Sequence, residues 1–183
     1  MGARRSGKAS GPNAPAGPAD GSGRETVLAP TVTVRVESAA TPDSVQLIRD
    51  SQAALLSYLP AEEIFSLDPE EMLAPNVTFF VARIDGRPMG CVALVDETGY
   101  GEIKRLFLRP EARGRGLAQA LMAEVEQYCR DIGLREIRAE TSPLLVEAAG
   151  LYQRLGYRPC DAFGDYPVLD SSLFLSKSLG RAV

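Results

Sequence analysis

The residues with the clearest capacity for chemistry form the run Arg113-Gly114-Arg115-Gly116-Leu117-Ala118, between a predicted strand and a predicted helix. Glycine lets the backbone adopt unusual dihedral angles and approach a ligand closely. The first turn of a helix leaves N–H groups unsatisfied and carries partial positive charge. Together these features make an anion cradle, and Arg113 and Arg115 add permanent charge that suits phosphate oxygens. The run therefore predicts a site for a phosphate or pyrophosphate.

Two common phosphate-binding motifs do not match this run. The P-loop of nucleoside triphosphatases requires G-x-x-x-x-G-K-[ST], and the chain contains no Gly-Lys-Ser or Gly-Lys-Thr. The dinucleotide fingerprint G-x-G-x-x-G is met by Gly114 and Gly116 at its first two positions, but Gln119 stands at the third. A dinucleotide-binding enzyme therefore stays as an alternative that Gln119 disfavours.

Composition limits the catalytic groups available elsewhere. The chain has no histidine and three cysteines, Cys91, Cys129 and Cys160. The absence of histidine excludes Ser-His-Asp and Cys-His catalysis and most catalytic zinc sites, so no metal is expected. Three widely spaced cysteines indicate free thiols in a reducing cytosol. Proton transfer must then use Asp, Glu, Lys, Tyr, Cys or water.

Hydrophobic periodicity predicts the elements that position these residues. Strands are expected at 31–36, 77–84, 89–95, 101–108, 136–141 and 173–178, and helices from Thr41 onward and at 61–67, 116–132 and 144–155. Asp85-Gly86 between two of the strands is typical of a tight hairpin turn. The strands come first as an antiparallel meander and then alternate with helices, which predicts a mixed α/β sheet with helices on its faces.

Two segments in this order resemble one known family. Arg113, Gly116 and Ala118 fit R-x-x-G-x-A, which is similar to the Q/R-x-x-G-x-G/A pyrophosphate loop of the GNAT family of acetyl-CoA-dependent N-acetyltransferases. The segment Leu151-Tyr152-Gln153-Arg154-Leu155-Gly156-Tyr157 resembles the family's L-Y-x-x-x-G-F/Y segment. The spacing between the two segments is also similar, and the likeness covers about residues 31–179.

The resemblance implies both a fold and a cofactor site. The fold is a mixed, mostly antiparallel sheet of six to seven strands, flanked by about four helices and splayed between strands four and five. The pantetheine arm of acetyl-CoA would lie along the backbone of Leu106, Phe107 and Leu108. The N–H groups that hold the pyrophosphate would come from Arg113, Gly114, Arg115, Gly116, Leu117 and Ala118.

The same resemblance implies an N-acetyltransferase that works without a covalent intermediate. A primary amine of a small molecule or peptide would attack the thioester directly in a ternary complex, aided by alignment of both reactants. Tyr152 matches the family's general acid, which protonates the departing thiolate. An amine is mostly protonated at pH 7, so a base is needed. Glu102, eleven residues before Arg113, resembles the glutamate base of the histone-acetylating branch.

One position departs from the family pattern. Many members have Asn or Gln six residues before the leucine of the L-Y pair, where this chain has Leu145. A catalytically inactive CoA-binding module of the same fold therefore stays as an alternative, although the presence of Tyr152 disfavours it. Asp165 and Tyr166 lie between the last two strands, a connection that often borders the acceptor site in this family, so they are candidate substrate contacts.

The remaining expectations concern organisation and partners. Gly, Pro, Ala and Ser dominate residues 1–30, which predicts a disordered tail before an N-acetyltransferase domain at 31–183. The net charge of -4 disfavours nucleic-acid binding. No apolar stretch approaches the ~20 residues that span a bilayer, so a cytoplasmic protein without membrane partners is expected. A homodimer is one candidate oligomeric state, because dimers are common in families of this kind.

Overall fold

A computed structural model of the chain describes residues 29–167 and 169–180. The strands are β1 (Val32–Val36), β2 (Val77–Ile84), β3 (Arg87–Glu97), β4 (Tyr100–Leu108), β5 (Glu136–Thr141), β6 (Arg158–Pro159) and β7 (Leu173–Ser178). The α-helices are α1 (Pro42–Leu56), α2 (Leu117–Asp131) and α3 (Val146–Arg154), and the 3-10 turns are η1 (Ala61–Glu63), η2 (Glu71–Leu73) and η3 (Pro110–Ala112). Within these described ranges no helix is both long and apolar enough to cross a membrane. The predicted tail lies almost entirely outside them.

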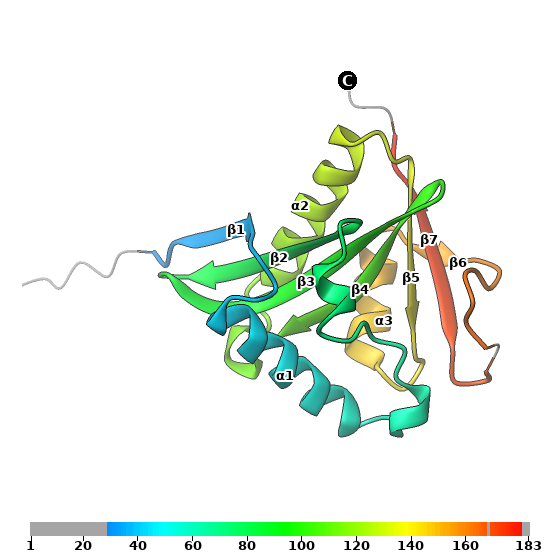
Figure 1. The fold of residues 1–183 in the computed structure, drawn as a ribbon, viewed down its shortest axis with the longest axis horizontal. Helices are drawn as coiled ribbons and strands as arrows, with labels where there is room; N and C mark the ends of the chain where they lie inside the picture. The colour runs from blue at the N-terminus through cyan, green and yellow to red at the C-terminus, as the bar shows by residue number, and fades with distance from the viewer. Residues whose placement is uncertain (1–28, 168, 181–183) are drawn as a thin grey trace, which may run out of the picture.

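The strands form one sheet in the order β1-β2-β3-β4-β5-β7-β6. Neighbouring strands are antiparallel except β4 and β5, which run parallel. This parallel pairing joins only residues 101–103 to residues 137–139, although both strands continue beyond it. Figure 1 shows the two strands diverging from that point. The predicted mixed, mostly antiparallel sheet that splays between its fourth and fifth strands is therefore confirmed.

Two details of the predicted secondary structure are wrong. The segment 61–67 forms only the 3-10 turn η1, so the described sheet is flanked by three α-helices instead of about four. Such a short segment gains too few hydrogen bonds to offset helix nucleation, and Pro60 before it provides no side-chain cap. The short strand β6 was not expected, because two residues are too few to show an alternating pattern.

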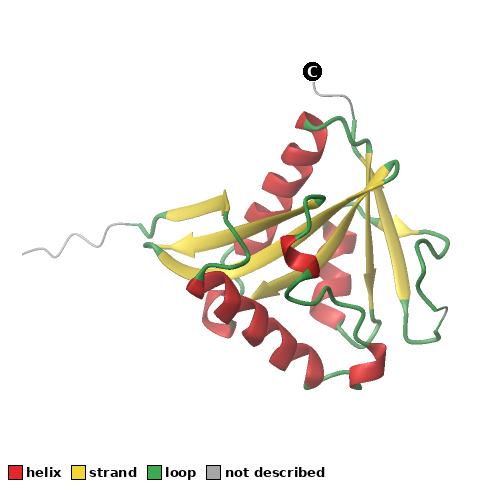
Figure 2. Ribbon diagram, in the orientation of Figure 1, coloured by secondary structure: helices red, strands yellow, loops and turns green. Residues whose placement is uncertain are grey.

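The helices cover opposite faces of the sheet, with α1 on one face and α2 and α3 on the other (Figures 1 and 2). Successive residues of a strand point to opposite faces, so each central strand contributes to two cores. In β2, Phe79 and Val81 pack in the core under α1, whereas Phe80 and Ala82 pack in the core under α2. The sheet is therefore buried on both sides at its centre.

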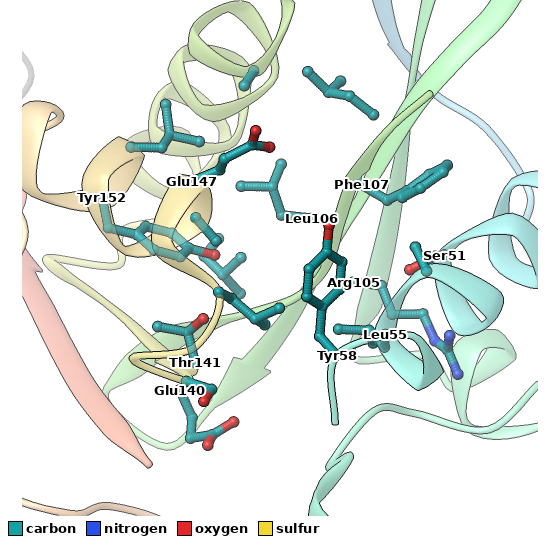
Figure 3. A pocket seen from close by; sticks show the side chains of 18 of the residues that line it. Ser51, Leu55, Tyr58, Arg105, Leu106, Phe107, Glu140, Thr141, Glu147 and Tyr152 are labelled. Atoms are coloured by element: carbon teal, nitrogen blue, oxygen red, sulfur yellow. The ribbon is translucent and has the colours of Figure 1, made fainter. Parts of the chain in front are cut away.

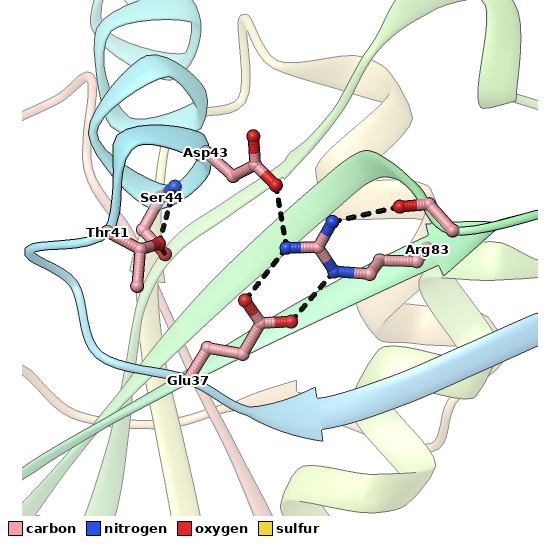
Figure 4. Close-up of polar contacts among 6 residues, drawn as sticks. Glu37, Thr41, Asp43, Ser44 and Arg83 are labelled. Atoms are coloured by element: carbon pink, nitrogen blue, oxygen red, sulfur yellow. Dashed lines mark hydrogen bonds and ion pairs between the residues drawn. The ribbon is translucent and has the colours of Figure 1, made fainter.

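The start of α1 is tied to the sheet by polar contacts around Arg83 (Figure 4). Thr41 caps the helix, because its Oγ1 accepts a hydrogen bond of 3.2 Å from the N–H of Ser44. The Arg83 guanidinium on β2 donates to both carboxylate oxygens of Glu37 at 2.9 Å and lies 2.8 Å from the Asp43 carboxylate. These contacts raise the pKa of Arg83. They hold α1 against the sheet, and the other end of α1 reaches the cavity described below.

Strand β4 contains a bulge next to the point where β5 departs. Cys91 pairs with Phe107 and Ala93 pairs with Lys104, so Arg105 and Leu106 together face one residue of β3. Arg105 has a φ of 50°, in the left-handed region that costs a non-glycine residue about 1–2 kcal/mol. Bulges re-aim the strand that carries them, and this one lies on the wall of the cavity.

Candidate functional site

A cavity of about 820 Å³ opens where β4 and β5 part. One wall consists of the end of α1 and the segment after it, and the other of β5, the start of α2 and α3. Figure 3 shows Tyr58, Leu55 and Ser51 on one side, Tyr152 and Glu140 on the other, and Leu106 between them. The volume lies within the range typical of small-molecule and cofactor sites.

The predicted phosphate loop forms one end of this cavity. Gly114 and Gly116 have φ values of 71° and 77°, and the start of α2 at Leu117 has no side-chain cap. The first N–H groups of α2 are thus left for a ligand. The loop residues that line the cavity are Arg113, Gly114, Gly116, Leu117, Ala118 and Gln119. Arg115 is exposed and does not lie on the cavity wall.

The three predicted residues of β4 also reach the cavity. Leu106, Phe107 and Leu108 line it directly after the bulge. The phosphate loop follows them in the chain after η3, so a strand edge leads into an uncapped helix start. This order suits an extended ligand that has an anionic group at one end.

Tyr152 of α3 is buried but directs its phenol into the cavity (Figure 3). Its ring packs edge-to-face on Tyr157, with ring centroids 5.2 Å apart. Burial, and then the neighbouring charge of Glu140, raise the pKa of the Tyr152 phenol. The phenol therefore keeps its proton at neutral pH, which suits a proton donor.

Glu102 lies behind the cavity wall. Its carboxylate is buried, accepts a hydrogen bond from the phenol of Tyr166, and lies 3.0 Å from the ammonium of Lys104. Lys104 also donates to the backbone oxygen of Phe65 at 3.2 Å and to Tyr166. Lys104 and Tyr166 line the cavity, whereas Glu102 does not. The role of Glu102 as a base stays a prediction.

The two predicted substrate contacts have different places. Tyr166 lies on the cavity wall, where its ring meets Phe65 edge-to-face with centroids 5.6 Å apart. Asp165 is exposed and is not part of that wall. The structure therefore brings Tyr166 to the site and leaves Asp165 outside it.

Glu140 of β5 is a site residue that the sequence reasoning missed. It lines the cavity, and its pKa is raised to about 7. Burial is the main cause, and the charge of Glu102 adds to it, while a hydrogen bond from Ser172 and the charge of Lys104 act against it. A carboxyl with a pKa near neutrality in a cavity is a candidate for proton transfer. Its position in the alternating strand 136–141 gave only the signal of a solvent-facing residue.

The wall opposite Tyr152 is mostly apolar. Its aliphatic and aromatic members are Leu55, Tyr58, Leu59, Ile64 and Phe65. The segment behind them is fastened to the bulge, because Arg105 donates to the Leu67 carbonyl at 3.0 Å and 2.6 Å and to Gln52 at 3.2 Å. Leu145, the departure from the family pattern, lies on the cavity wall before α3.

The residues present fit a CoA-type ligand. An uncapped helix start with the guanidinium of Arg113 suits a pyrophosphate, and Leu106–Leu108 provide a strand edge beside it. Arg113 also lies 3.3 Å from the exposed carboxylate of Glu147. Because an exposed ion pair is weak, a ligand phosphate can replace Glu147 as the partner of this guanidinium. Among the described residues, no cluster of three His, Cys, Asp or Glu side chains could hold a metal ion.

Comparisons with known proteins identify the family. A model of the acetyltransferase (GNAT) family matches residues 45–157. A protein of Azospirillum brasilense named IAA acetyltransferase is 36% identical over 152 residues, which cover 82% of this chain and 99% of that protein. The YsnE protein of Bacillus subtilis, an uncharacterised N-acetyltransferase, is 25% identical over 149 residues, 80% of this chain and 99% of its own.

Solved structures give the same result. A protein of Klebsiella pneumoniae assigned as an acyl-CoA N-acyltransferase has a TM-score of 0.69 and 28% identity, covering 81% of this chain and 98% of its own. The PaiA N-acetyltransferase of Thermoplasma acidophilum, solved in complex with coenzyme A, shares the fold with a TM-score of 0.66 and 20% identity, covering 81% and 99%. This chain belongs to the GNAT family of acetyltransferases and is an acyltransferase.

Proposed function

We propose that this chain transfers an acetyl group from acetyl-CoA to a primary amine of a small molecule or peptide, by direct attack in a ternary complex. The supporting observation is that the uncapped start of α2 and the phenol of Tyr152 open into one cavity. Bound acetyl-CoA would supply an acetyl thioester. The protein holds both reactants in line, and this alignment provides much of the rate acceleration.

The residues of the cavity divide the work by position. The N–H groups of Gly114, Gly116, Leu117 and Ala118 hold the pyrophosphate, with the guanidinium of Arg113 beside them, whereas the N–H of Arg113 itself donates to the Pro110 carbonyl. The backbone of Leu106–Leu108 holds the pantetheine arm. Tyr152 donates its proton to the departing thiolate, because a buried phenol with a raised pKa is protonated at neutral pH, and the acylated nitrogen returns a proton to the phenol as the sulfur takes one.

The acceptor end of the cavity suggests which amines to test. Its wall carries Leu55, Tyr58 and Phe65, so amines with an apolar body belong in the panel beside polyamines, amino acids and N-terminal peptides. The name of the Azospirillum relative adds IAA to the panel. The experiment measures thiol release from acetyl-CoA with each compound and CoA binding by calorimetry.

The decisive variant is Tyr152→Phe. It is expected to lower kcat by about 10²- to 10⁴-fold, the usual contribution of a general acid, while the KM for acetyl-CoA changes little. Tyr157→Phe is the matched control, because Tyr157 is a buried tyrosine that packs edge-to-face on Tyr152 but does not line the cavity. Full turnover in Tyr152→Phe would show that the acid role is wrong.

The wild-type chain separates the alternatives. CoA binding without transfer to any amine would favour the inactive CoA-binding module. If calorimetry of folded protein detects no CoA binding, the proposal fails, and heat of binding with a dinucleotide instead would favour the dinucleotide-binding alternative.

A further inference from the structure

Glu140 lies at the point where the two central strands separate. The last residues paired between β4 and β5 are Ile103 and Ala139, and both belong to the core under α2. Because strand residues alternate between faces, Lys104 and Glu140, the next residues along each strand, lie on the opposite face. The strands part there, and the Glu140 side chain lines the cavity that opens between them.

We propose that the Glu140 carboxylate accepts the proton of the acceptor ammonium and so forms the amine that attacks the thioester. This inference rests on the proposed acetyl transfer. The neutral nitrogen forms a bond to the carbonyl carbon, the carbon–sulfur bond breaks, and its electron pair leaves with the sulfur. Tyr152 protonates that sulfur, and the second proton of the nitrogen restores the phenol. Glu140 then releases its proton to water, so one proton leaves the site per turnover.

The surroundings of Glu140 keep it suited to this role at neutral pH. The charged and titratable groups that act on it are Glu102 and Lys104 from β4 and Tyr152 from α3, and Ser172 before β7 forms a hydrogen bond with it. Burial raises its pKa to about 7. A base is most effective when its pKa lies near the working pH, because it is then both present as carboxylate and strong enough to take a proton.

The other carboxylates at the site are less suited to accept a proton. Glu102 forms an ion pair with Lys104 at 3.0 Å, accepts a hydrogen bond from Tyr166, and lies behind the cavity wall. Glu147 is exposed and pairs with Arg113 at 3.3 Å. Glu63 lines the wall formed by η1, which follows α1, whereas Glu140 and Tyr152 share one side of the cavity (Figure 3). Glu140 and Glu147 thus share a side of the cavity with the proposed acid, and of these two Glu147 is paired with Arg113.

The test is the pH profile of kcat/KM for the best amine, measured on the full chain. In the wild type we expect a decrease on the acid side centred near pH 7. Glu140→Gln should lower kcat/KM at least 100-fold at pH 7.5 and remove that acid limb, while the Kd for CoA stays within about twofold. Glu136→Gln, the same substitution near the start of β5, is the matched control and should leave the profile unchanged.

Glu102→Gln separates the two candidate bases. The Glu102 charge raises the pKa of Glu140, so its removal should keep the acid limb and move it to lower pH. If instead Glu102→Gln or Glu63→Gln abolishes the limb and Glu140→Gln keeps it, the proposal is overturned. A Glu140→Asp variant should keep an acid limb in the pH profile and have a higher kcat/KM than Glu140→Gln. A purely structural role for Glu140 would not require either result.

A fluorinated analogue of the same amine provides the second readout. Its ammonium loses the proton in solution below pH 7, so no base is needed before attack. Glu140→Gln should therefore lose less than tenfold with this analogue, and an equal loss with both amines would overturn the proposal. A wild-type chain that acetylates no amine would instead refute the proposed function itself, so the two failures are distinguishable.

Discussion

Gly116 offers a quantitative test of how the start of α2 binds its ligand. Its φ is 77°, and a Cβ placed on it would meet no atom within 4 Å. The cost of Gly116→Ala is therefore purely conformational, about 1–2 kcal/mol for an L-residue in the left-handed region. If alanine keeps this conformation, the free energy of unfolding falls by that amount. If the loop relaxes, the first N–H groups of α2 turn away and the Kd for CoA rises about 5- to 30-fold.

Both effects have the same origin, so the loss of unfolding free energy and the loss of binding free energy should sum to about 1–2 kcal/mol. Chemical denaturation of the free protein gives the first and calorimetry with CoA gives the second. Gly86→Ala is the matched control, because Gly86 in the β2–β3 turn has a φ of 78° and equally open surroundings. Gly86→Ala should lower the free energy of unfolding and leave the Kd for CoA unchanged. A sum under about 0.5 kcal/mol, or an equal loss of CoA affinity in Gly86→Ala, would refute the reasoning.

The remaining predictions concern charge. Arg113→Ala should weaken CoA binding about tenfold at low salt and less at high salt, because the lost contact is between opposite charges; calorimetry at two ionic strengths measures this. Lys177→Met removes an ammonium that lies 2.7 Å from both carboxylate oxygens of buried Glu126. Because Arg130 still lies 3.6 Å from Glu126, the free energy of unfolding should fall by only about 2 kcal/mol in urea titrations, and adding Glu126→Gln should restore part of that loss. Because burial raises the pKa of Glu140 from 4.5 to about 7, the folded state holds this proton more tightly than the unfolded state. The free energy of unfolding should therefore decrease as pH rises through that window, and the decrease should be smaller in Glu140→Gln.

Local signals in the sequence were sufficient wherever one short segment decides the geometry. Asp85-Gly86 predicted a tight hairpin, and both residues have positive φ values, 49° and 78°. Gly114 and Gly116 before an amphipathic helix predicted the uncapped start of α2, which the structure contains. In each case the backbone conformation depends on residues next to each other in the chain.

The sequence did not predict features that depend on the register between strands distant in the chain. Glu136, Arg138 and Glu140 alternate with apolar residues in β5, a pattern typical of a solvent-facing side. Only the short parallel pairing with β4 places Glu140 at the opening of the cavity. The fold also brings the phenol of Tyr166, from the connection before β7, onto the Glu102 carboxylate, a contact between distant segments that no local pattern predicts.

The short pairing between β4 and β5 leaves the sheet as two halves that few backbone hydrogen bonds connect. β1 to β4 form one half-sheet with extensive ladders, β5 to β7 form another, and residues 101–103 and 137–139 provide the strand pairing between them. Breaking so short a pairing locally costs less free energy than unfolding either half of the sheet. A ligand that binds in the cavity between β4 and β5 stabilises the paired state, because it binds that state more tightly than the state in which the pairing is broken. Amide hydrogen exchange along β5 should therefore slow when CoA binds, and hydrogen exchange with and without CoA measures this effect.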